Sequence, residues 1–395
     1  MVPKDIDAAA DRCYGCSNPQ CKEACPIKLE IPKIIDFVKK DDLESAYREI
    51  IKKSYLGSVC SRVCPQEQQC EGSCVRGIAS TPVDIGEIEK YVSDWGLKNC
   101  KEDMMPITYE KVAIIGSGPA GLTCAIELRR MGYDVTIFER ENELGGILRY
   151  GIPEYRLPNK IVDSVVENIL SYGIKVNTNQ TFGEDFTLED LANDDFKAAF
   201  LGIGNDMPKL LNIPGSELKG VYGANDFLKN IDNINFERVL VVGGGNVAMD
   251  VARMAKLKGA KEVTDVYRKT KIMMKANKLE VEAAEKEGIK FKFESVPSEI
   301  VGSNGNVDGV ICSDGDTILA DTIVMAIGSL PDFEKISDEI ELTDESLIKV
   351  DENGETSLTG LFAGGDLVER RATVCMAIKS ATIAANGINK ELRSL

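Results

Sequence analysis

The sequence contains no histidine among its 395 residues. This absence excludes Ser-His-Asp and Cys-His catalytic arrangements, His-ligated zinc and His proton relays. Long apolar runs are also missing, because the longest ones are short and interrupted by glycine, so no membrane span is expected. The first ten residues are polar and acidic, unlike a secretory signal peptide. We therefore expect a location in the reducing cytoplasm, where cysteines serve metals or redox work more often than disulfides.

Positive charge is in deficit. The chain has 47 Lys and Arg against 64 Asp and Glu, a formal net charge of −17. Such a chain is repelled by nucleic acid and by anionic membranes, so neither is expected as a partner. Hydrophobic residues make up 43%, enough for buried cores, and the length suits two or three domains.

Cysteine is the residue that stands out. Twelve are present, and eight of them lie between Cys13 and Cys74. These eight form two compact groups, Cys13, Cys16, Cys21 and Cys25, followed by Cys60, Cys64, Cys70 and Cys74. Soft thiolates at this close spacing can wrap two cubane iron–sulfur clusters. Two structural zinc sites of four cysteines each are the alternative, and the redox nucleotide motifs that follow favour iron–sulfur.

The Cys-Pro steps after each run resemble bacterial ferredoxins, in which the last cysteine of a run crosses to the other cluster. By that logic the first cluster is held by Cys13, Cys16, Cys21 and Cys74, and the second by Cys25, Cys64 and Cys70. Its fourth ligand is Cys60 or Glu89. Glu89 shares the inward face of a helix predicted over 82–95 with Ile85, Ile88 and Val92, where a carboxylate is costly unless it is paired or coordinating. A salt bridge or cap at the domain seam is the other reading of Glu89, and both stay open.

A dinucleotide-binding turn follows a buried strand predicted over 112–115. Gly116-x-Gly118-x-x-Gly121 opens a helix that runs to about residue 131, and a second strand over 134–138 ends at Glu139. The glycines allow the tight turn, the approach of pyrophosphate and close helix packing, and the acid suits a ribose diol. Because Glu139 would repel a 2′-phosphate, this unit is expected to take FAD or NAD rather than NADP.

A second turn of the same kind, Gly243-x-Gly245-x-x-Ala248, follows a strand over 239–242. The position of the acid is occupied by the basic residues Arg268 and Lys269, and Lys275 follows. Cations there suit the 2′-phosphate of NADP, although NAD and a solvated basic turn remain alternatives.

Two further glycine turns complete the nucleotide motifs. Gly145-Gly146 comes soon after the first unit, and Gly364-Gly365-Asp366 ends a strand near the C-terminus. Asp366 could hold the ribityl chain of a flavin, and a helix beginning at Thr373–Val374 could face its pyrimidine edge. An ordinary Gly-Gly-Asp turn is the alternative.

Together these motifs resemble the glutamate synthase small-subunit family. That family also includes the electron-input half of dihydropyrimidine dehydrogenase and the large subunit of electron-bifurcating ferredoxin:NADP transhydrogenase. The segments that carry the resemblance are 12–26, 59–67, 70–74, 111–121, 145–158, 326–332 and 363–366.

The resemblance implies an α/β flavoprotein with two dinucleotide-binding domains, the FAD domain interrupted by an NAD(P)H domain and preceded by a small helical domain with two [4Fe–4S] clusters. The expected bounds are 1–105 for the cluster domain, 106–226 and 328–395 for the FAD domain, and 227–327 for the NAD(P)H domain. It also implies that Gln or Glu completes one cluster in some members, which supports Glu89 beside Cys60. The expected nucleotide contacts are Gly116, Gly118, Pro119, Ala120, Gly121, Glu139, Arg140, Gly145, Gly146, Arg149, Gly204, Gly243, Gly245, Asn246, Val247, Arg268, Lys269, Lys275, Gly328, Gly365, Asp366, Thr373 and Val374.

The function implied is electron transfer from NADPH, or from NADH, through FAD and two [4Fe–4S] clusters to a partner protein in a hetero-oligomer. The flavin part contains no Cys-x-x-Cys, which argues against disulfide reduction. A module of a ferredoxin:NAD(P) transhydrogenase complex and a zinc-stabilised nucleotide-binding redox sensor are the rival hypotheses.

Overall fold

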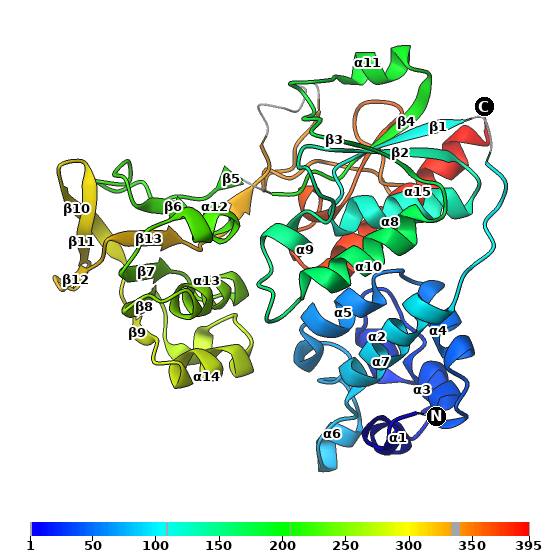
Figure 1. The fold of residues 1–395 in the computed structure, drawn as a ribbon, viewed down its shortest axis with the longest axis horizontal. Helices are drawn as coiled ribbons and strands as arrows, with labels where there is room; N and C mark the ends of the chain where they lie inside the picture. The colour runs from blue at the N-terminus through cyan, green and yellow to red at the C-terminus, as the bar shows by residue number, and fades with distance from the viewer. Residues whose placement is uncertain (1, 108–109, 206, 333–339, 395) are drawn as a thin grey trace. The chain divides into compact units, whose positions relative to one another are not determined.

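A computed structural model describes residues 2–107, 110–205, 207–332 and 340–394. The chain divides into two compact units (Figure 1). The first contains Met1–Arg149, Glu154–Gly204 and Phe333–Leu395, and the second contains Tyr150–Pro153 and Asn205–Asp332. Each unit is described by itself below.

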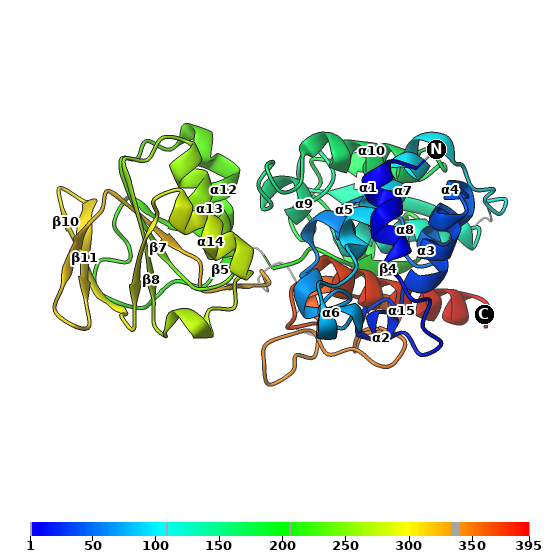
Figure 2. The same cartoon turned by 90° about the horizontal axis from the view of Figure 1, so that it is seen from below.

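The N-terminal part of the first unit is helical, as Figure 2 shows. Its elements are α1 (Lys4–Asp11), α2 (Gln20–Ala24), α3 (Ile31–Lys39), α4 (Leu43–Ile51), α5 (Gly57–Val63), η1 (Gln66–Gln68), α6 (Arg76–Ala79) and α7 (Ile85–Asn99). The Asp42 carboxylate caps α4 by accepting a hydrogen bond from the Ser45 N–H at 3.1 Å. The helix predicted over 82–95 is α7, and its face of Ile85, Ile88 and Val92 is buried.

The rest of the first unit is built on a five-stranded parallel sheet in the order β15-β4-β1-β2-β3. The elements are β1 (Lys111–Ile115), α8 (Pro119–Arg130), β2 (Asp134–Glu139), α9 (Ile147–Tyr150), α10 (Asn159–Leu170), β3 (Lys175–Thr178), α11 (Leu188–Asn193), β4 (Phe196–Leu201), β15 (Leu361–Ala363), η5 (Gly365–Leu367) and α15 (Val374–Leu392). The central strand β1 is buried from Val112 to Ile115, as a strand covered on both faces must be. The helices α8 and α15 pack against each other on one side of this sheet (Figure 1).

The second unit holds another parallel sheet, in the order β6-β13-β7-β8-β9. An antiparallel sheet β10-β11-β12 and the two-stranded β14-β5 accompany it. The elements are β5 (Met207–Pro208), β6 (Val221–Gly223), α12 (Ala224–Asn230), η2 (Ile231–Asn233), β7 (Arg238–Val242), α13 (Asn246–Leu257), β8 (Glu262–Tyr267), η3 (Lys271–Met273), α14 (Lys278–Lys286), β9 (Lys290–Phe293), β10 (Pro297–Ser303), β11 (Asn306–Cys312), β12 (Thr317–Leu319), β13 (Thr322–Met325) and β14 (Ser329–Leu330).

The compact units and the expected domain bounds do not coincide at every point. The second unit begins at Asn205, before residue 227, because β6 pairs with β13 and β5 pairs with β14. The helical segment 1–105 and the first parallel sheet form one unit, since α7 and α5 pack against α10. Within the described ranges, no helix has both the length and the apolar character needed to cross a membrane.

Candidate functional site

The first glycine turn connects β1 to α8 and has the geometry of a phosphate cradle. Gly116 has a φ of +97°, and a Cβ on Gly121 would lie 1.9 Å from the Gly116 carbonyl oxygen, so both positions require glycine. A Cβ on Gly118 would meet nothing within 4 Å, so the space in front of this residue is open. Pro119 begins α8 and Ala120 is its buried second residue. An open backbone at a helix N-terminus is suited to bind the pyrophosphate of a dinucleotide.

Glu139, at the end of β2, is buried and directed at this turn. Its Oε2 accepts hydrogen bonds from the backbone N–H and the hydroxyl of Ser117, at 2.9 and 2.5 Å, and its Oε1 accepts one from the Glu141 N–H at 2.9 Å. Each carboxylate oxygen has a further lone pair. The acid is therefore held beside the turn, where it could accept from a ribose diol.

The Gly145-Gly146 turn adjoins the first one. A Cβ on Gly146, whose φ is +51°, would lie 2.9 Å from the Gly118 Cα, and the Gly145 N–H donates to the Ser117 hydroxyl at 3.0 Å. Arg149 is fastened within the protein: its Nε donates to the Leu144 carbonyl at 2.9 Å and its guanidinium pairs with Asp163. Arg140 is exposed, with its Nε 3.3 Å from Glu141 Oε1.

The C-terminal glycine turn contains the carboxylate of Asp366, which has no hydrogen-bond partner among the described residues. Asp366 lies in η5 after β15, and it accepts no hydrogen bond from the residues that the structure describes. Burial, followed by the charge of Glu369, raises its pKa to about 6. Gly365 has a φ of +72°, and α15 begins at Val374 with Thr373 as its N-cap. An unpaired buried acid at this place is consistent with the predicted contact to a polyol chain.

The second glycine turn, between β7 and α13, repeats the first. A Cβ on Gly243 would lie 2.6 Å from the Ala326 carbonyl oxygen, whereas one on Gly245 would meet nothing within 4 Å. Asn246 accepts the Asn277 N–H at 2.8 Å, and Val247 is 43% exposed at the start of α13. The turn thus leaves its middle backbone open, as the first one does. Gly204 and Gly328, with φ of +71° and +109°, follow β4 and β13 at the ends of strands where α/β folds bind ligands.

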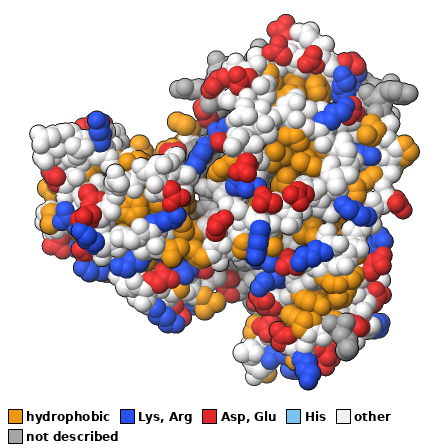
Figure 3. Space-filling model, in the orientation of Figure 1, with side chains coloured by type: hydrophobic (Ala, Val, Ile, Leu, Met, Phe, Trp, Pro, Cys, Tyr) orange, Lys and Arg blue, Asp and Glu red, His pale blue; other side chains and the backbone are white. Residues whose placement is uncertain are grey.

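The predicted basic segment is docked on the second turn by its backbone. The Lys275 N–H donates to the Gly244 carbonyl at 2.8 Å. Arg268 and Lys275 are exposed and Lys269 is half-buried, and none of the three has an ion pair with the described residues. The neighbouring Lys271, by contrast, pairs with Glu285 at 2.5 Å. Figure 3 shows Lys and Arg side chains gathered over β9 and α14 of this unit. Unpaired cations in an acidic chain are suited to an anionic ligand.

The first group of cysteines comes together from both ends of the cysteine-rich segment. Burial, with smaller contributions from the neighbouring thiols of Cys74 and Cys13, raises the pKa of Cys21 to about 11. Cys16 lies in the same loop as Cys13, and Gly15 between them has a φ of +62°. Cys74 is thus an electrostatic neighbour of Cys21, while the crossover expected from the ferredoxin-like run stays a prediction.

The second group is more deeply buried. Cys25 has Glu89 and Cys60 as charged neighbours, and burial raises its pKa to about 11. Cys60 and Cys64 are joined by a backbone hydrogen bond, from the Cys64 N–H to the Cys60 carbonyl at 3.0 Å. Cys70 has Glu89 and Cys25 beside it, and burial raises its pKa. The structure therefore brings Cys25, Cys60, Cys64, Cys70 and Glu89 into one neighbourhood.

Glu89 is the acidic member of this group. Burial, with smaller contributions from Cys375 and Glu71, raises its pKa to about 8. It has no ion pair or hydrogen bond with the described residues, so the salt bridge considered above is not present among them. Glu87, two residues earlier on the same helix, is exposed and pairs with Lys90 at 3.0 Å. A half-buried carboxylate among thiols, with no partner among the described residues, has the chemistry of an iron ligand.

Cys375 also belongs to this neighbourhood, and sequence reasoning missed it. It lies in α15, far along the chain from the other thiols, yet its Sγ accepts a hydrogen bond from Gln69 Nε2 of the cysteine-rich segment at 3.4 Å. The spacing of the residues carries no signal for this contact. Only the packing of α15 against α5 produces it.

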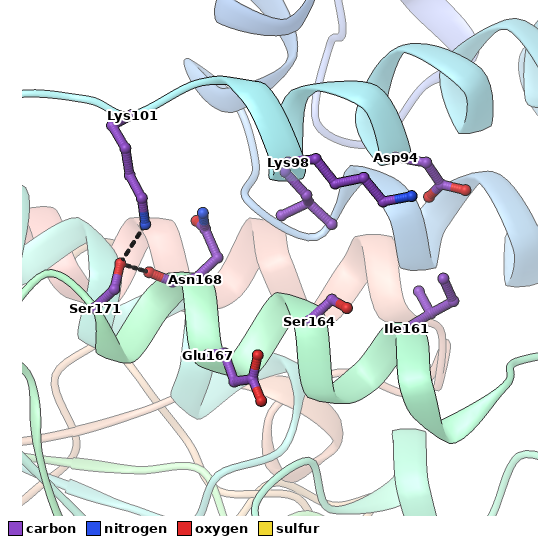
Figure 4. Close-up of a pocket in the computed structure, with 9 residues that line it drawn as sticks. Asp94, Lys98, Lys101, Ile161, Ser164, Glu167, Asn168 and Ser171 are labelled. Atoms are coloured by element: carbon purple, nitrogen blue, oxygen red, sulfur yellow. Dashed lines mark hydrogen bonds between the residues drawn. The ribbon is translucent and has the colours of Figure 1, made fainter.

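A groove of about 440 Å³ lies elsewhere in the first unit, between α7 and α10 (Figure 4). Across one end of it, Lys101 donates to the Ser171 hydroxyl at 2.7 Å. It is lined by Asp94, Leu97, Lys98, Lys101, Ile161, Ser164, Glu167, Asn168 and Ser171. None of these is a predicted site residue.

Two family models match the chain. The pyridine nucleotide-disulphide oxidoreductase model matches residues 110–382, and the model described as dihydropyrimidine dehydrogenase domain II, 4Fe-4S cluster, matches residues 1–101. The matches establish FAD and NAD(P) as the nucleotide cofactors and a 4Fe–4S domain at the N-terminal end. The alternative of two structural zinc sites is therefore set aside in favour of iron–sulfur clusters.

Relatives match over nearly the whole length. The chain is 34% identical to the glutamate synthase [NADPH] small chain of Escherichia coli K12, with 96% of this chain and 90% of that protein covered. It is also 34% identical to the NAD-dependent dihydropyrimidine dehydrogenase subunit PreT of the same organism, with 97% and 93% covered. The thioredoxin reductase structure of Lactococcus lactis, at 24% identity and a TM-score of 0.60, covers 72% of this chain and all of that one, and shares the fold.

Proposed function

The chain belongs to the pyridine nucleotide-disulphide oxidoreductase family, together with the glutamate synthase small chains and PreT subunits, and from this we propose that it oxidises NADPH and delivers the electrons singly to a partner protein. It is an FAD-dependent NAD(P)H oxidoreductase with an N-terminal 4Fe–4S domain. The observation that carries the proposal is the hydrogen bond from Gln69 to Cys375 in α15, because it joins the cysteine-rich segment to the helix that begins beside the proposed flavin turn.

The first unit has the residues to hold FAD. The open backbone at Gly118 would take the pyrophosphate, Glu139 the ribose diol and Asp366 the ribityl chain. The N-terminus of α15, at Thr373 and Val374, would stabilise negative charge at the pyrimidine edge. Bound flavin supplies the exchange between a two-electron hydride and single electrons. The residues of the chain would position the nicotinamide against the flavin and exclude water, and neither task requires histidine.

The second unit has the residues to hold the reductant. Gly245 would face the pyrophosphate, while Arg268, Lys269 and Lys275 would face a 2′-phosphate. The relatives differ on this point, since one is described as NADPH-dependent and the other as NAD-dependent. Our assignment of NADPH is supported by the unpaired cations on this chain.

We assign the two cysteine groups to two [4Fe–4S] clusters. Cys13, Cys16, Cys21 and Cys74 would hold the first, and Cys25, Cys64, Cys70 and either Cys60 or Glu89 the second. The second lies against α15, and the first has the exposed side chains Tyr14 and Ile78 nearby. This arrangement supports a path that runs from flavin to the second cluster, then to the first, and then to a partner.

A partner subunit and a cytoplasmic location complete the proposal. None of the twelve cysteines, all of which lie in the described residues, forms a disulfide, and this is consistent with a reducing compartment. The relatives are described as a small chain and as a subunit, so we infer that a second polypeptide uses the electrons. Whether that polypeptide is a synthase-like subunit, a dehydrogenase or a ferredoxin-type acceptor is decided by which protein co-purifies.

The test is to isolate the full chain anaerobically and measure flavin, iron and acid-labile sulfide. We expect one FAD, eight irons and eight sulfides for each chain, in line with two cubane clusters. Addition of NADPH should bleach the flavin and produce an electron paramagnetic resonance signal from reduced clusters. Isolated material that lacks both sulfide and flavin would refute the proposal.

The fourth ligand of the second cluster is tested by two variants. If Glu89 coordinates iron, Glu89→Ala changes the spectrum and stability of the second cluster while Cys60→Ala leaves both unchanged. If Cys60 coordinates iron, the two variants exchange their effects. Full retention of both clusters in each variant would remove both residues from the ligand set.

A further inference from the structure

The groove between α7 and α10 contains a buried amide that lacks a partner. Asn168, on α10, is 6% exposed, and its Oδ1 is buried without a hydrogen-bond partner among the described residues. The side chain points from α10 toward α7 (Figure 4). An amide can donate through Nδ2 and accept through Oδ1, and leaving it unpaired in a buried place is costly. This side chain is therefore suited to pair with a molecule in the groove.

Two cations lie at opposite ends of the same groove. Lys101 donates to the Ser171 hydroxyl at 2.7 Å at one end, and Lys98 is directed toward the other end, where Asp94 and Ile161 lie (Figure 4). Both lysines are exposed, and neither has an ion pair among the described residues. Each ammonium group is therefore available to an anion.

The acidic side chains of the groove do not neutralise these cations. Asp94 is already paired with Arg62, whose guanidinium donates to both of its carboxylate oxygens at 3.0 and 2.6 Å. Glu167 is exposed and is directed away from α7 (Figure 4). Leu97 and Ile161 add apolar surface to the lining. The groove thus combines a free cation at each end with a buried amide and apolar side chains, and its volume of about 440 Å³ suits a small molecule.

We propose that this groove binds a small dicarboxylate, with one carboxylate at Lys101 and Asn168 and the other at Lys98. Ser164 and Ser171, which line the groove, lie about 10 Å apart along α10, at about 1.5 Å per residue. A compact anion such as phosphate cannot contact both ends, whereas an extended dicarboxylate of about six carbons can, because the lysine side chains reach toward it. The bound molecule would connect the helical N-terminal part to α10, and this inference does not depend on the proposed function.

The experiment titrates the full chain, isolated anaerobically with its cofactors, with adipate at low ionic strength by isothermal titration calorimetry. Hexanoate, which has the same chain length but a single carboxylate, and inorganic phosphate are the comparison ligands. The variants are Lys98→Ala, Lys101→Ala and Asn168→Leu. Lys90→Ala is the matched control, because Lys90 also lies on α7 but pairs with Glu87 and does not line the groove.

We expect one adipate to bind per chain, and hexanoate and phosphate to bind at least about tenfold more weakly. Lys98→Ala and Lys101→Ala should each weaken adipate binding about tenfold or more, through loss of a charge-assisted hydrogen bond, while Lys90→Ala should not change it. Asn168→Leu should weaken adipate binding and also raise the Tm of the free protein, because it removes the unpaired amide. A purely structural Asn168 would instead lower the Tm when replaced.

No binding of adipate at millimolar concentration would overturn the inference, as would equal affinity for hexanoate or phosphate. Equal affinity of the wild type, Lys98→Ala and Lys101→Ala would assign binding to another place and overturn it too. If Asn168→Leu does not fold, the two exposed lysine variants and the comparison ligands decide. Reduction of the flavin by NADPH should be the same in the lysine variants as in the wild type, so failure of this inference leaves the proposed function intact.

Discussion

At the scale of single residues, basic side chains with a carboxylate partner differ in role from basic side chains without one. Arg149 and Lys271 have carboxylate partners, so their charges are used within the fold. Arg268 and Lys275 have no ion pair among the described residues. A charge that the protein leaves uncompensated next to an open glycine turn is available to a ligand.

Replacement of Arg268 by alanine is expected to raise the KM for NADPH about 10- to 100-fold and to leave the KM for NADH unchanged. The reason is the loss of a charge-assisted hydrogen bond to the 2′-phosphate, which contributes about 1.5–3 kcal/mol. Lys271→Ala is the matched control, because Lys271 is a neighbouring cation already paired with Glu285. Steady-state rates with both nucleotides measure the effect. Equal rates with NADPH and NADH in the wild type would remove the assignment of Arg268.

Asp265 is a second uncompensated residue, with a different consequence. It lies on β8 with 0% exposure, beside Val241 and Phe291 of the neighbouring strands, and neither carboxylate oxygen has a hydrogen-bond partner. Burial raises its pKa well above the ordinary value of 3.8. The folded chain therefore retains a proton that the unfolded chain releases.

The contribution of Asp265 to the free energy of unfolding decreases as pH rises. The stability contributed by protonated Asp265 is fully present below pH 3.8 and is lost as pH rises towards the folded pKa. Asp265→Val should therefore stabilise the protein, by about 1–3 kcal/mol at pH 7, and the gain should be smaller at pH 4. Urea unfolding followed by circular dichroism at both pH values measures it, with the exposed Asp308→Val as control. A gain that does not grow with pH would contradict this account.

At the scale of elements, the two strand–turn–helix units use glycine for two separate reasons. At Gly121 the missing side chain permits packing, since a Cβ would meet the Gly116 carbonyl oxygen at 1.9 Å. At Gly118 and Gly245 the missing side chain leaves open space in front of a helix N-terminus. A side chain at Gly121 would disturb the fold, whereas a side chain at Gly118 or Gly245 would disturb only the binding of a ligand.

Alanine substitutions should separate these reasons. Gly121→Ala is expected to destabilise the first unit by about 3 kcal/mol or more, because backbone atoms cannot move away easily. Gly118→Ala should fold but contain less FAD, and Gly245→Ala should keep its FAD and bind NADPH more weakly. Flavin absorbance, thermal unfolding and NADPH titration measure the three outcomes. A Gly118→Ala protein with full flavin content would show that the pyrophosphate lies elsewhere.

At the scale of the whole molecule, the cysteine-rich segment is buried on the flavin side and exposed on the other. Cys60, Cys70 and Cys375 are buried, whereas Tyr14 and Ile78, near the first group, are 67% and 87% exposed. The Arg76 guanidinium lies over the Tyr14 ring, 4.6 Å from its centre. Exposed apolar side chains beside an electron-transfer group are suited to a protein partner.

Replacement of Ile78 by aspartate is expected to weaken binding of the co-purifying partner about tenfold, because a charge would be buried at the interface. Reduction of the flavin by NADPH should not change. Leu319→Asp is the control, since Leu319 is 60% exposed on β12 of the second unit. Surface plasmon resonance gives the Kd values. Equal losses in both variants, or none in Ile78→Asp, would place the interface elsewhere.

Local patterns in the sequence were sufficient for much of this account. The strands before both glycine turns, the acid at Glu139 and the helix carrying Glu89 were predicted within a few residues, because each depends on side-chain periodicity and turn chemistry near in the chain. The α/β class, the helical N-terminal part and the two kinds of cofactor followed from the same motifs.

Contacts between distant segments were decided only by the tertiary structure. No spacing rule brings Cys375 to Gln69, pairs β6 with β13 or leaves Asp265 without a partner, since these depend on how α15 and the strands of the second sheet pack. Residues close in sequence share local geometry, and their chemistry can be inferred from order alone. Residues far apart meet only after the chain has buried its apolar faces, so the link from flavin turn to cluster cysteines required the fold.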